Sequence, residues 1–346
     1  MTNHISSVSV IIPCRNEERF IAMCLDSIIA QNYPKNKLEV LVVDGMSNDC
    51  SREIVLEYVK RYSFIRLLEN LKLIAPIALN IGIHEARGEI IVRIDAHATY
   101  ETNYIDQCVK LLQTTDATNV GGMQRAVGTD YVSNTIAVAI NHPFGIGDAK
   151  FRYSNREEWV DTVYLGSWYK QSLENLGGFN EEWVVNQDYE LNYRLRESGG
   201  KILLSPKICC HYYVRSSLKK LAFQYFRYGF WKVKTIVNHP NSVRWRQLVP
   251  PVFVLTLIAS LALIPFFHIC VIVPGLYVIS NLMASFQATS QRGRRYLPLL
   301  PFIFVILHIS WGTGFLIGLT RFGIPRFSLR SLLRSLADIF RRSKDN

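Results

Sequence analysis

The first 125 residues alternate between short apolar runs and longer stretches with apolar residues at helical spacing. The short, β-branched runs predict buried strands at Val8–Pro13, Glu39–Asp44, Phe64–Leu68 and Glu89–Asp95. The longer stretches predict helices at Glu17–Gln31, Ser51–Arg61, Ala75–Ala86 and Asn103–Gln113. Strands that alternate with helices of this length indicate an α/β fold with a mostly parallel sheet, covered by helices on both faces.

The pattern is less regular from residue 126 to residue 186, where glycines interrupt it. Residues 187–200 then show helical spacing and finish on paired glycines, a common helix end. The segment Phe223–Val233 is aromatic and basic, and we expect it to lie along a membrane surface.

Three long apolar runs dominate the C-terminal part, at Leu248–Phe267, Ile269–Phe286 and Leu297–Leu319. Each run approaches the roughly 20 residues that a helix needs to cross a bilayer. We therefore predict an α/β domain over residues 1–240 and a membrane region over residues 241–346, with two to three transmembrane segments and a basic amphipathic tail.

Charge divides along the same line. Residues 1–200 carry 19 Lys and Arg against 26 Asp and Glu, a net charge of −7, whereas residues 201–346 carry 20 against 2, a net charge of +18. Basic residues beside apolar runs fit anionic lipid headgroups and the cytoplasmic ends of membrane helices. Because the positive charge is not on a folded soluble face, we expect no binding to nucleic acid.

Neither a signal peptide nor a disulfide framework is indicated. Met1–Ser7 is polar, and the following apolar run is too short for the core of a signal peptide, so we expect the first part to stay in the cytosol. The seven cysteines are odd in number and scattered, without a C-x-x-C pair, which argues against disulfides and a zinc site.

Polar clusters follow three of the predicted strands, at Pro13–Glu18, Asp44–Asp49 and Asp95–His97. In open α/β sheets, ligands bind at the carboxyl ends of the strands. Any single cluster could be an ordinary capped loop, but three at successive strand ends predict a binding site.

These residues resemble a known family. The runs VSVIIPCRNEE, VVDGMSND, RIDAHA and NQDYELNYRLRESGG occur in the order and at the spacing of the family-2 inverting glycosyltransferases, which have the GT-A fold. The DAHA form, the NQD helix and the QYFRYG-x-WK segment resemble in particular the bacterial exopolysaccharide glucosyltransferases of the succinoglycan type. The resemblance covers residues 8–240 and implies a GT-A-like domain that binds a nucleotide-sugar.

The resemblance implies a donor site in the first half of the chain. Asp44 matches the acidic residue that hydrogen-bonds the nucleotide base, usually uracil, and Pro13 and Glu17 match a loop that contacts the nucleotide. Asp44 could instead cap the helix that follows Ser47. Gly45 stands where many relatives have a second acidic residue, which leaves the ribose contacts open.

Asp95 and His97 match the family's D-x-D motif, which implies a divalent cation, Mg²⁺ or Mn²⁺, on the donor diphosphate. Such a cation acts as a Lewis acid when the bond to the leaving group breaks. Imidazole suits Mn²⁺ better than Mg²⁺, so His97 leaves the identity of the metal open. His211 is a further candidate ligand, by analogy with a later histidine in some related transferases.

Asp188 matches the family's catalytic base, which takes the proton of the acceptor hydroxyl during in-line attack on the anomeric carbon. The same carboxylate could only complement a helix dipole, and Glu190 is the alternative base. Gln224, Arg227 and Trp231 loosely resemble the Q-x-x-R-W signature of membrane glycan synthases, in which the arginine holds the leaving diphosphate. Arg227 could equally bind lipid phosphate.

The residues and the resemblance together predict an inverting, metal-dependent hexosyltransferase of the inner or plasma membrane. We expect a UDP-sugar donor, a polyprenyl-linked glycan acceptor in cell-surface polysaccharide synthesis, and a cytoplasmic catalytic domain. Two alternatives stay open: transfer to a polyprenyl phosphate itself, and a non-catalytic membrane assembly subunit that binds nucleotide-sugar. The apolar runs lack acidic residues, which argues against ion-coupled transport.

The tail creates a conflict between two rules. Three full crossings would export the C-terminus, yet the chain after Arg321 is basic and has leucines at helical spacing, as in helices that lie on anionic membranes. We therefore predict a cytoplasmic C-terminus and a re-entrant Leu297–Leu319, bent near Gly312 and Gly314.

Overall fold

The computed structural model describes residues 5–147, 149–214, 216–290 and 292–325. The chain divides into two compact units, one formed by residues 1–125 and 150–213, the other by residues 126–149 and 214–346. This division differs from the predicted boundary at residue 240, because two short helices near residue 140 and the long helix at 218–238 belong to the second unit. The predicted basic tail, residues 326–346, lies outside the described residues.

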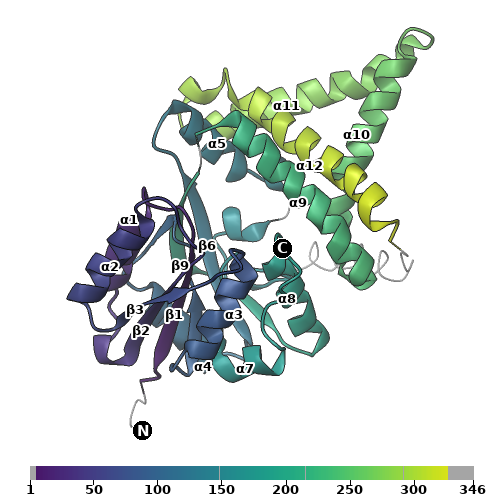
Figure 1. Cartoon of the computed structure of the whole chain (residues 1–346). Coiled ribbons are helices and arrows are strands. Elements are labelled where there is room, and N and C mark those ends of the chain that lie inside the picture. Colours follow the sequence, from purple (N-terminus) through teal and green to yellow (C-terminus); the bar gives the residue numbers. More distant parts are fainter. Residues whose placement is uncertain (1–4, 148, 215, 291, 326–346) are drawn as a thin grey trace. The chain divides into compact units, whose positions relative to one another are not determined.

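The first unit is built on a mixed sheet with nine strands among the described residues, in the order β3-β2-β1-β4-β8-β6-β9-β5, with β7 beside β9 (Figure 1). The strands are β1 (Val8–Cys14), β2 (Leu38–Asp44), β3 (Ile65–Glu69), β4 (Ile90–Arg93), β5 (Ala98–Tyr100), β6 (Asn119–Val127), β7 (Glu158–Trp159), β8 (Ser167–Tyr169) and β9 (Ile202–Tyr213). The predicted parallel arrangement is confirmed for β3-β2-β1-β4. The pairs β4–β8, β6–β8, β5–β9 and β7–β9 are antiparallel, and the irregular region of the sequence supplies the short strands β7 and β8.

Helices cover both faces of this sheet. Residues of α1 (Ile21–Ile29), α2 (Ser51–Arg61) and α4 (Tyr104–Thr114) share one apolar core with alternate strand residues such as Ile12. Residues of α3 (Ala75–Glu85), α7 (Lys170–Asn175) and α8 (Gln187–Glu197) share a second core with the intervening positions such as Ile11. This division follows from the two-residue period of a strand, which points successive side chains to opposite faces.

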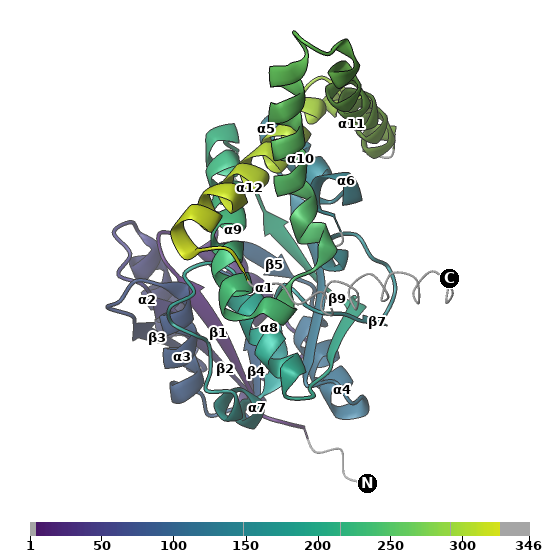
Figure 2. The same ribbon diagram turned by 90° about the vertical axis from the view of Figure 1, so that its right-hand side faces the viewer.

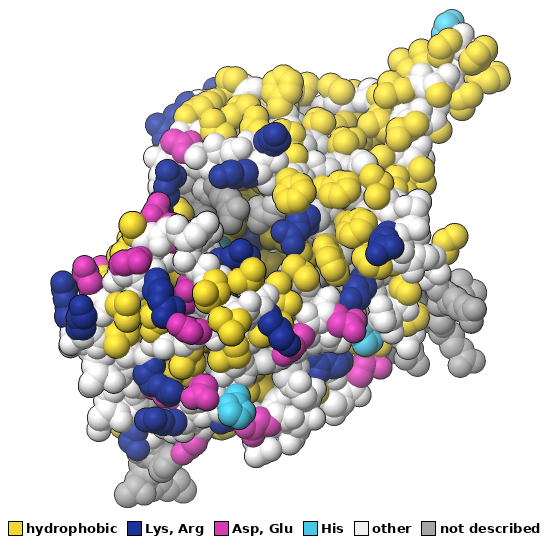
Figure 3. Space-filling model, in the orientation of Figure 1, with side chains coloured by type: hydrophobic (Ala, Val, Ile, Leu, Met, Phe, Trp, Pro, Cys, Tyr) yellow, Lys and Arg dark blue, Asp and Glu magenta, His cyan; other side chains and the backbone are white. Residues whose placement is uncertain are grey.

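The second unit consists of helices. They are α5 (Tyr131–Ile140), α6 (Pro143–Ile146), α9 (Leu218–Asn238), α10 (Trp245–Leu263), α11 (Ile272–Ser290) and α12 (Leu300–Phe322). Three segments of the described chain are long and apolar enough to cross a membrane: Trp245–Leu263, His268–Ser290 and Leu300–Phe322. Hydrophobic side chains cover the surface around α10 and α11 in Figure 3, as expected for helices that face lipid.

A histidine inside this unit joins three of its helices. His308 of α12 lies 2.7 Å from the carbonyl oxygen of Phe144 and 3.0 Å from the hydroxyl of Tyr277. Because the carbonyl can only accept, Nε2–H of His308 donates to Phe144 and Nδ1 accepts from Tyr277. The imidazole therefore ties α6 and α11 to α12.

Glycines bring α9 and α12 into backbone contact (Figure 2). A Cβ on Gly314 of α12 would collide with the carbonyl oxygen of Phe226, and one on Gly229 of α9 with that of Trp311. A Cβ on Gly312 would lie 2.6 Å from the carbonyl oxygen of Pro250 in α10. Small residues at such positions allow apolar helices to approach closely.

The predicted bend in the last apolar run is wrong. The helix α12 continues through Gly312 and Gly314 without interruption. These glycines serve close packing against α9 and α10, so they do not break the helix.

Candidate active site

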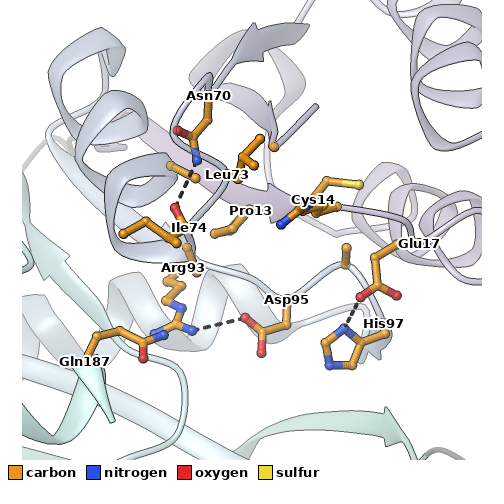
Figure 4. Close-up of a pocket in the computed structure, with 15 residues that line it drawn as sticks. Pro13, Cys14, Glu17, Asn70, Leu73, Ile74, Arg93, Asp95, His97 and Gln187 are labelled. Atoms are coloured by element: carbon orange, nitrogen blue, oxygen red, sulfur yellow. Dashed lines mark hydrogen bonds and ion pairs between the residues drawn. The ribbon is translucent and has the colours of Figure 1, made fainter. Parts of the chain in front are cut away.

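The carboxyl ends of β1, β2 and β4 lie next to one another, as the polar clusters predict. Cys14 pairs with Asp44 across β1 and β2, and Ile11 pairs with Arg93 across β1 and β4. A pocket of about 260 Å³ opens at this edge (Figure 4). The residues that line it include Pro13, Glu17, Arg93, Asp95, His97 and Gln187.

Strained backbone surrounds the same pocket. The non-glycine residues with positive φ in the described chain are Asn16, Met46, Leu73 and Asn186, with φ between 53° and 69°. Leu73 lines the pocket, and each of the other three is next in sequence to a residue that does. Asparagine adopts this conformation readily, whereas at Met46 and Leu73 it costs on the order of 1–3 kcal/mol, and such strain is concentrated at functional sites.

Asp95 lies at the centre of the site, with its side chain 16% exposed. Its Oδ1 lies 3.3 Å from an Arg93 nitrogen, and its Oδ2 accepts a short hydrogen bond from the hydroxyl of Tyr164. Burial acts to raise the pKa of Asp95, but the positive charge of Arg93, then His97, and the Tyr164 hydrogen bond outweigh it and hold that pKa below its ordinary value. The carboxylate therefore stays charged at neutral pH.

Arg93 connects Asp95 to the predicted base. Its second terminal nitrogen forms an ion pair with Oδ1 of Asp188, at the start of α8. Arg93 is 5% exposed, and the face of the Phe179 ring lies 5.9 Å from its guanidinium carbon. The two carboxylates are thus joined through one buried guanidinium.

Glu190, the alternative base, is engaged elsewhere. It is 1% exposed, and both of its oxygens accept hydrogen bonds from Arg194, at 2.7 and 2.9 Å. Arg194 also donates to the carbonyls of Leu176 and Gly178. This arrangement fixes the loop before α8, so the geometry favours Asp188 over Glu190 as the base.

His97 meets a residue of the first loop. Its Nδ1 lies 3.1 Å from Oε1 of Glu17 (Figure 4). Its ring contacts the ring of Tyr212 edge to face, with 5.2 Å between the ring centroids. The structure therefore brings Pro13, Glu17, Asp95 and His97 to one pocket.

Three other predicted residues lie outside this cluster. Asp44 is 1% exposed and accepts from the hydroxyl of Ser47 at 2.6 Å, but α2 begins only at Ser51 and has no side-chain cap, so this contact does not cap the helix. His211 lies 3.7 Å from Glu101, and its neighbours Cys210 and Tyr212 project to the opposite face of β9. Arg227 lies on α9 in the second unit, with its guanidinium 5.8 Å from the ring of Phe223.

Comparison with known proteins identifies the family. The family model described as Glycosyl transferase family 2 matches residues 9–170. The chain is 30% identical to the succinoglycan biosynthesis protein ExoA of Rhizobium meliloti over 314 residues, which are 90% of this chain and 94% of that protein. The chain belongs to glycosyl transferase family 2. It is therefore a glycosyltransferase, as predicted.

Two further relatives extend the comparison. A dolichyl N-acetyl-alpha-D-glucosaminyl phosphate 3-beta-D-2,3-diacetamido-2,3-dideoxy-beta-D-glucuronosyltransferase of Methanococcus voltae is 28% identical, covering 91% of this chain and 97% of that protein. The solved structure of mannosyltransferase PcManGT from Pyrobaculum calidifontis, in complex with GDP-Man and Mn²⁺, matches with a TM-score of 0.59 at 19% identity, over 91% of this chain and 88% of that one. At that identity the match concerns the fold, and it confirms the predicted GT-A-like α/β fold.

The side chains of this family-2 transferase suit a cation that is shared with a ligand. The described residues contain no group of three or more His, Cys, Asp or Glu side chains that could hold a metal ion. Asp95 and His97 offer one carboxylate and one imidazole at the pocket. A divalent ion held by one or two protein groups commonly takes its other ligands from substrate phosphates. The residues therefore fit a cation that binds together with a diphosphate.

Sequence reasoning missed Arg93, Tyr164 and Gln187 as site residues. The sequence does mark Arg93 as unusual, because it is the only basic residue in a predicted strand that is otherwise apolar from Ile90 up to Asp95. A buried charge in such a strand normally has a charged partner. Tyr164 had no comparable signal, since it lies in the irregular region.

Proposed function

We propose that this glycosyltransferase inverts the anomeric centre, depends on a divalent metal, and moves a sugar from a nucleotide-diphosphate donor to a lipid-linked glycan. The observation that carries the proposal is the junction of Asp188 and Asp95 through Arg93 at the pocket formed by the strand ends. The junction holds the two carboxylates close together, Asp188 for the acceptor side and Asp95 for the donor side.

In the proposed reaction, Asp188 accepts the proton of the acceptor hydroxyl as its oxygen attacks the anomeric carbon. The bond between that carbon and the diphosphate oxygen breaks, and the nucleotide diphosphate leaves with the bonding electrons. Asp95 and His97 would hold the cation, which supplies Lewis-acid stabilisation of the leaving diphosphate when bound.

The thiol in the pocket lining is unsuited to a double displacement. A double displacement would require a nucleophile to form a covalent sugar intermediate. Cys14 is the thiol in the pocket lining, and burial, followed by the charges of Glu17 and Asp44, raises its pKa well above the ordinary value. A neutral, buried thiol is a poor nucleophile.

The relatives and the apolar helices support the acceptor. One relative is named for succinoglycan biosynthesis and another for transfer to a dolichyl phosphate-linked sugar. The three segments long enough to cross a membrane would hold the enzyme beside such lipids, with the first unit on the cytoplasmic face. We expect a polyprenyl-linked glycan as the acceptor, with polyprenyl phosphate itself as the alternative.

The test is a transfer assay with the full chain in detergent. Labelled UDP-, GDP- and dTDP-hexoses are each offered with membrane lipid extract or with polyprenyl phosphate alone, in the presence of Mn²⁺ or Mg²⁺. We expect a labelled lipid product from one donor class, formed from the extract, and its loss in Asp188→Asn. No product and no donor turnover with every donor would contradict the proposal. A product from polyprenyl phosphate alone would move the assignment to the alternative acceptor.

A further inference from the structure

Arg93 has more hydrogen-bonding capacity than the protein uses. Its two terminal nitrogens contact Asp95 and Asp188, whereas its buried Nε–H has no acceptor among the described residues. The side chain lines the pocket and points into it, with Asp95 on one side and Gln187 on the other (Figure 4). A buried N–H without a partner in a pocket lining calls for an acceptor that the pocket receives.

The ion pair with Asp188 conflicts with the role of a base. A carboxylate held by a guanidinium is stabilised in its charged form and accepts a proton poorly. Glu190 cannot replace it, because Arg194 engages both of its oxygens. The Arg93–Asp188 contact therefore has to loosen before Asp188 can take a proton.

A diphosphate can release this contact. Its oxygens match the planar, multiply donating guanidinium, and it brings more negative charge than one carboxylate. The side chain of Asp188 is 26% exposed as a whole, while the oxygen that pairs with Arg93 is buried, so this carboxylate lies at the border between protein and solvent. Arg93 itself stays anchored in β4 and needs only a change of side-chain conformation.

We propose that Arg93 is a positioning residue that pairs with Asp188 while the pocket is empty and turns to the donor diphosphate when the donor binds. Donor binding thereby frees the base. The inference rests on the proposed function in two respects, namely that the ligand is a diphosphate and that Asp188 is the base.

Thermodynamic coupling gives the inference a measurable sign. If the diphosphate competes with Asp188 for Arg93, weakening the Arg93–Asp188 pair must tighten diphosphate binding, and the effect must disappear without Arg93. A merely structural ion pair predicts the reverse, because its loss would loosen the pocket and weaken binding.

The experiment measures binding without turnover. Dissociation constants of UDP, GDP and inorganic pyrophosphate, each with Mn²⁺, are determined by calorimetry for the full chain in detergent. The proteins are the wild type, Asp188→Asn, Arg93→Gln and the double variant. Asp116→Asn, whose carboxylate is 84% exposed and pairs with Lys201, is the matched control.

We expect Asp188→Asn to tighten binding of the best diphosphate by about two- to fivefold, the range of a partly exposed ion pair. Arg93→Gln should weaken binding, the double variant should match Arg93→Gln, and Asp116→Asn should match the wild type. Thermal unfolding of each variant checks that it is folded. Should Arg93→Gln not fold, Arg93→Lys takes its place, with weaker binding and a smaller effect of Asp188→Asn expected.

The outcomes separate the two proposals. Unchanged or weaker binding in Asp188→Asn would overturn the role of Arg93 and leave the proposed function standing. If Asp188→Asn tightened diphosphate binding equally in the presence of Arg93 and in the Arg93→Gln background, the role of Arg93 would also be overturned. If the wild type binds none of the three diphosphates, both the inference and the proposed function are wrong.

Discussion

The first turn of α8 carries two carboxylates, Asp188 and Glu190, which have different surroundings. Asp188 meets Arg93 at the pocket, and Glu190 is enclosed by Arg194. Sequence spacing favours Asp188 by resemblance alone, and the structure adds a physical reason, since Glu190 is 1% exposed and Arg194 binds both of its oxygens.

This difference predicts opposite phenotypes for the two positions. Asp188→Asn should lower the rate of transfer by about 10²- to 10⁴-fold while donor binding persists, because a general base contributes that much. Glu190→Gln should instead lower the free energy of unfolding by about 1–3 kcal/mol, because it weakens charged hydrogen bonds to Arg194. Single-turnover rates and thermal unfolding separate the two effects. Near-normal turnover in Asp188→Asn would exclude it as the base.

The metal site gives a second prediction at this scale. Asp95→Asn should weaken nucleotide-sugar binding, because the bound cation loses its carboxylate. His97→Asp should shift the preferred ion from Mn²⁺ toward Mg²⁺, because oxygen replaces nitrogen. Activity is compared across cations and after chelation, and full activity of the wild type in excess chelator would contradict both expectations.

Only part of the site can be predicted from single residues. Asp95 and His97 follow a strand whose end is plain in the sequence, and Glu17 follows another, so their meeting follows from parallel topology. Tyr164 reaches Asp95 from a region without periodicity, and its contact depends on a fold of the chain that no local pattern encodes. Asp44 is buried and accepts a hydrogen bond from Ser47, and its contact with the nucleotide base stays a prediction.

At the scale of elements, the strands β1 to β4 and the helices α1 to α4 are predictable because each has a strong period of its own, whereas β5 and β6 are not among the predicted strands. The helix α1 begins at Ile21, four residues later than predicted, because Asn16 has left-handed backbone and Glu17 begins a turn. The glycines of α12 were misinterpreted as helix breakers. A glycine that permits a close approach looks the same in sequence as one that permits a bend.

The contact between α9 and α12 predicts unequal effects of two glycine substitutions in apolar helices. Gly314→Ala should lower the stability of the full chain by about 1–3 kcal/mol, because its Cβ meets the carbonyl of Phe226. At Gly275 in α11 an added Cβ has no atom within 4 Å. Gly275→Ala should therefore leave the stability of the chain unchanged or raise it slightly, because alanine has the higher helix propensity. Thermal unfolding in one detergent compares them, and equal shifts would contradict the packing argument.

The helix α9 also offers a matched pair of cations. Arg227 lies over Phe223 at 5.8 Å and Lys234 over Trp231 at 5.6 Å, so each side chain rests on a ring of its own helix. If Arg227 holds a leaving diphosphate, Arg227→Ala should lower transfer far more than Lys234→Ala, because a guanidinium binds phosphate bidentately. Equal, small losses with reduced membrane binding would instead favour a lipid-surface role for both.

At the scale of the whole molecule, the three apolar helices are not equivalent. In α12, 39% of the most apolar stretch is buried inside the protein. The corresponding shares are 22% for Trp245–Leu263 and 17% for His268–Ser290. Its partner α9 carries five basic residues, and such a helix is costly to surround with lipid. We therefore expect α10 and α11 to cross the membrane as a hairpin, while α12 stays with α9 at the cytoplasmic surface.

Reporter fusions test this topology. A reporter inserted between α10 and α11, at Phe266, should be active only outside the cytoplasm. One fused after Ile324 should be active only inside, like one at the N-terminus. External activity of the fusion after Ile324 would make α12 a third span and reverse the side assigned to the C-terminus.

The backbone contact between α9 and α12 also bears on the order of biosynthesis. The chain that forms the first unit is complete at Tyr213, before any of the three long apolar helices leaves the ribosome. Such a unit can fold during translation, N-terminal parts first. The second unit cannot complete its fold at that stage, because Gly229 of α9 packs against Trp311 of α12, which is translated much later. A truncation within α12 would therefore give a folded first unit attached to an exposed, aggregation-prone α9.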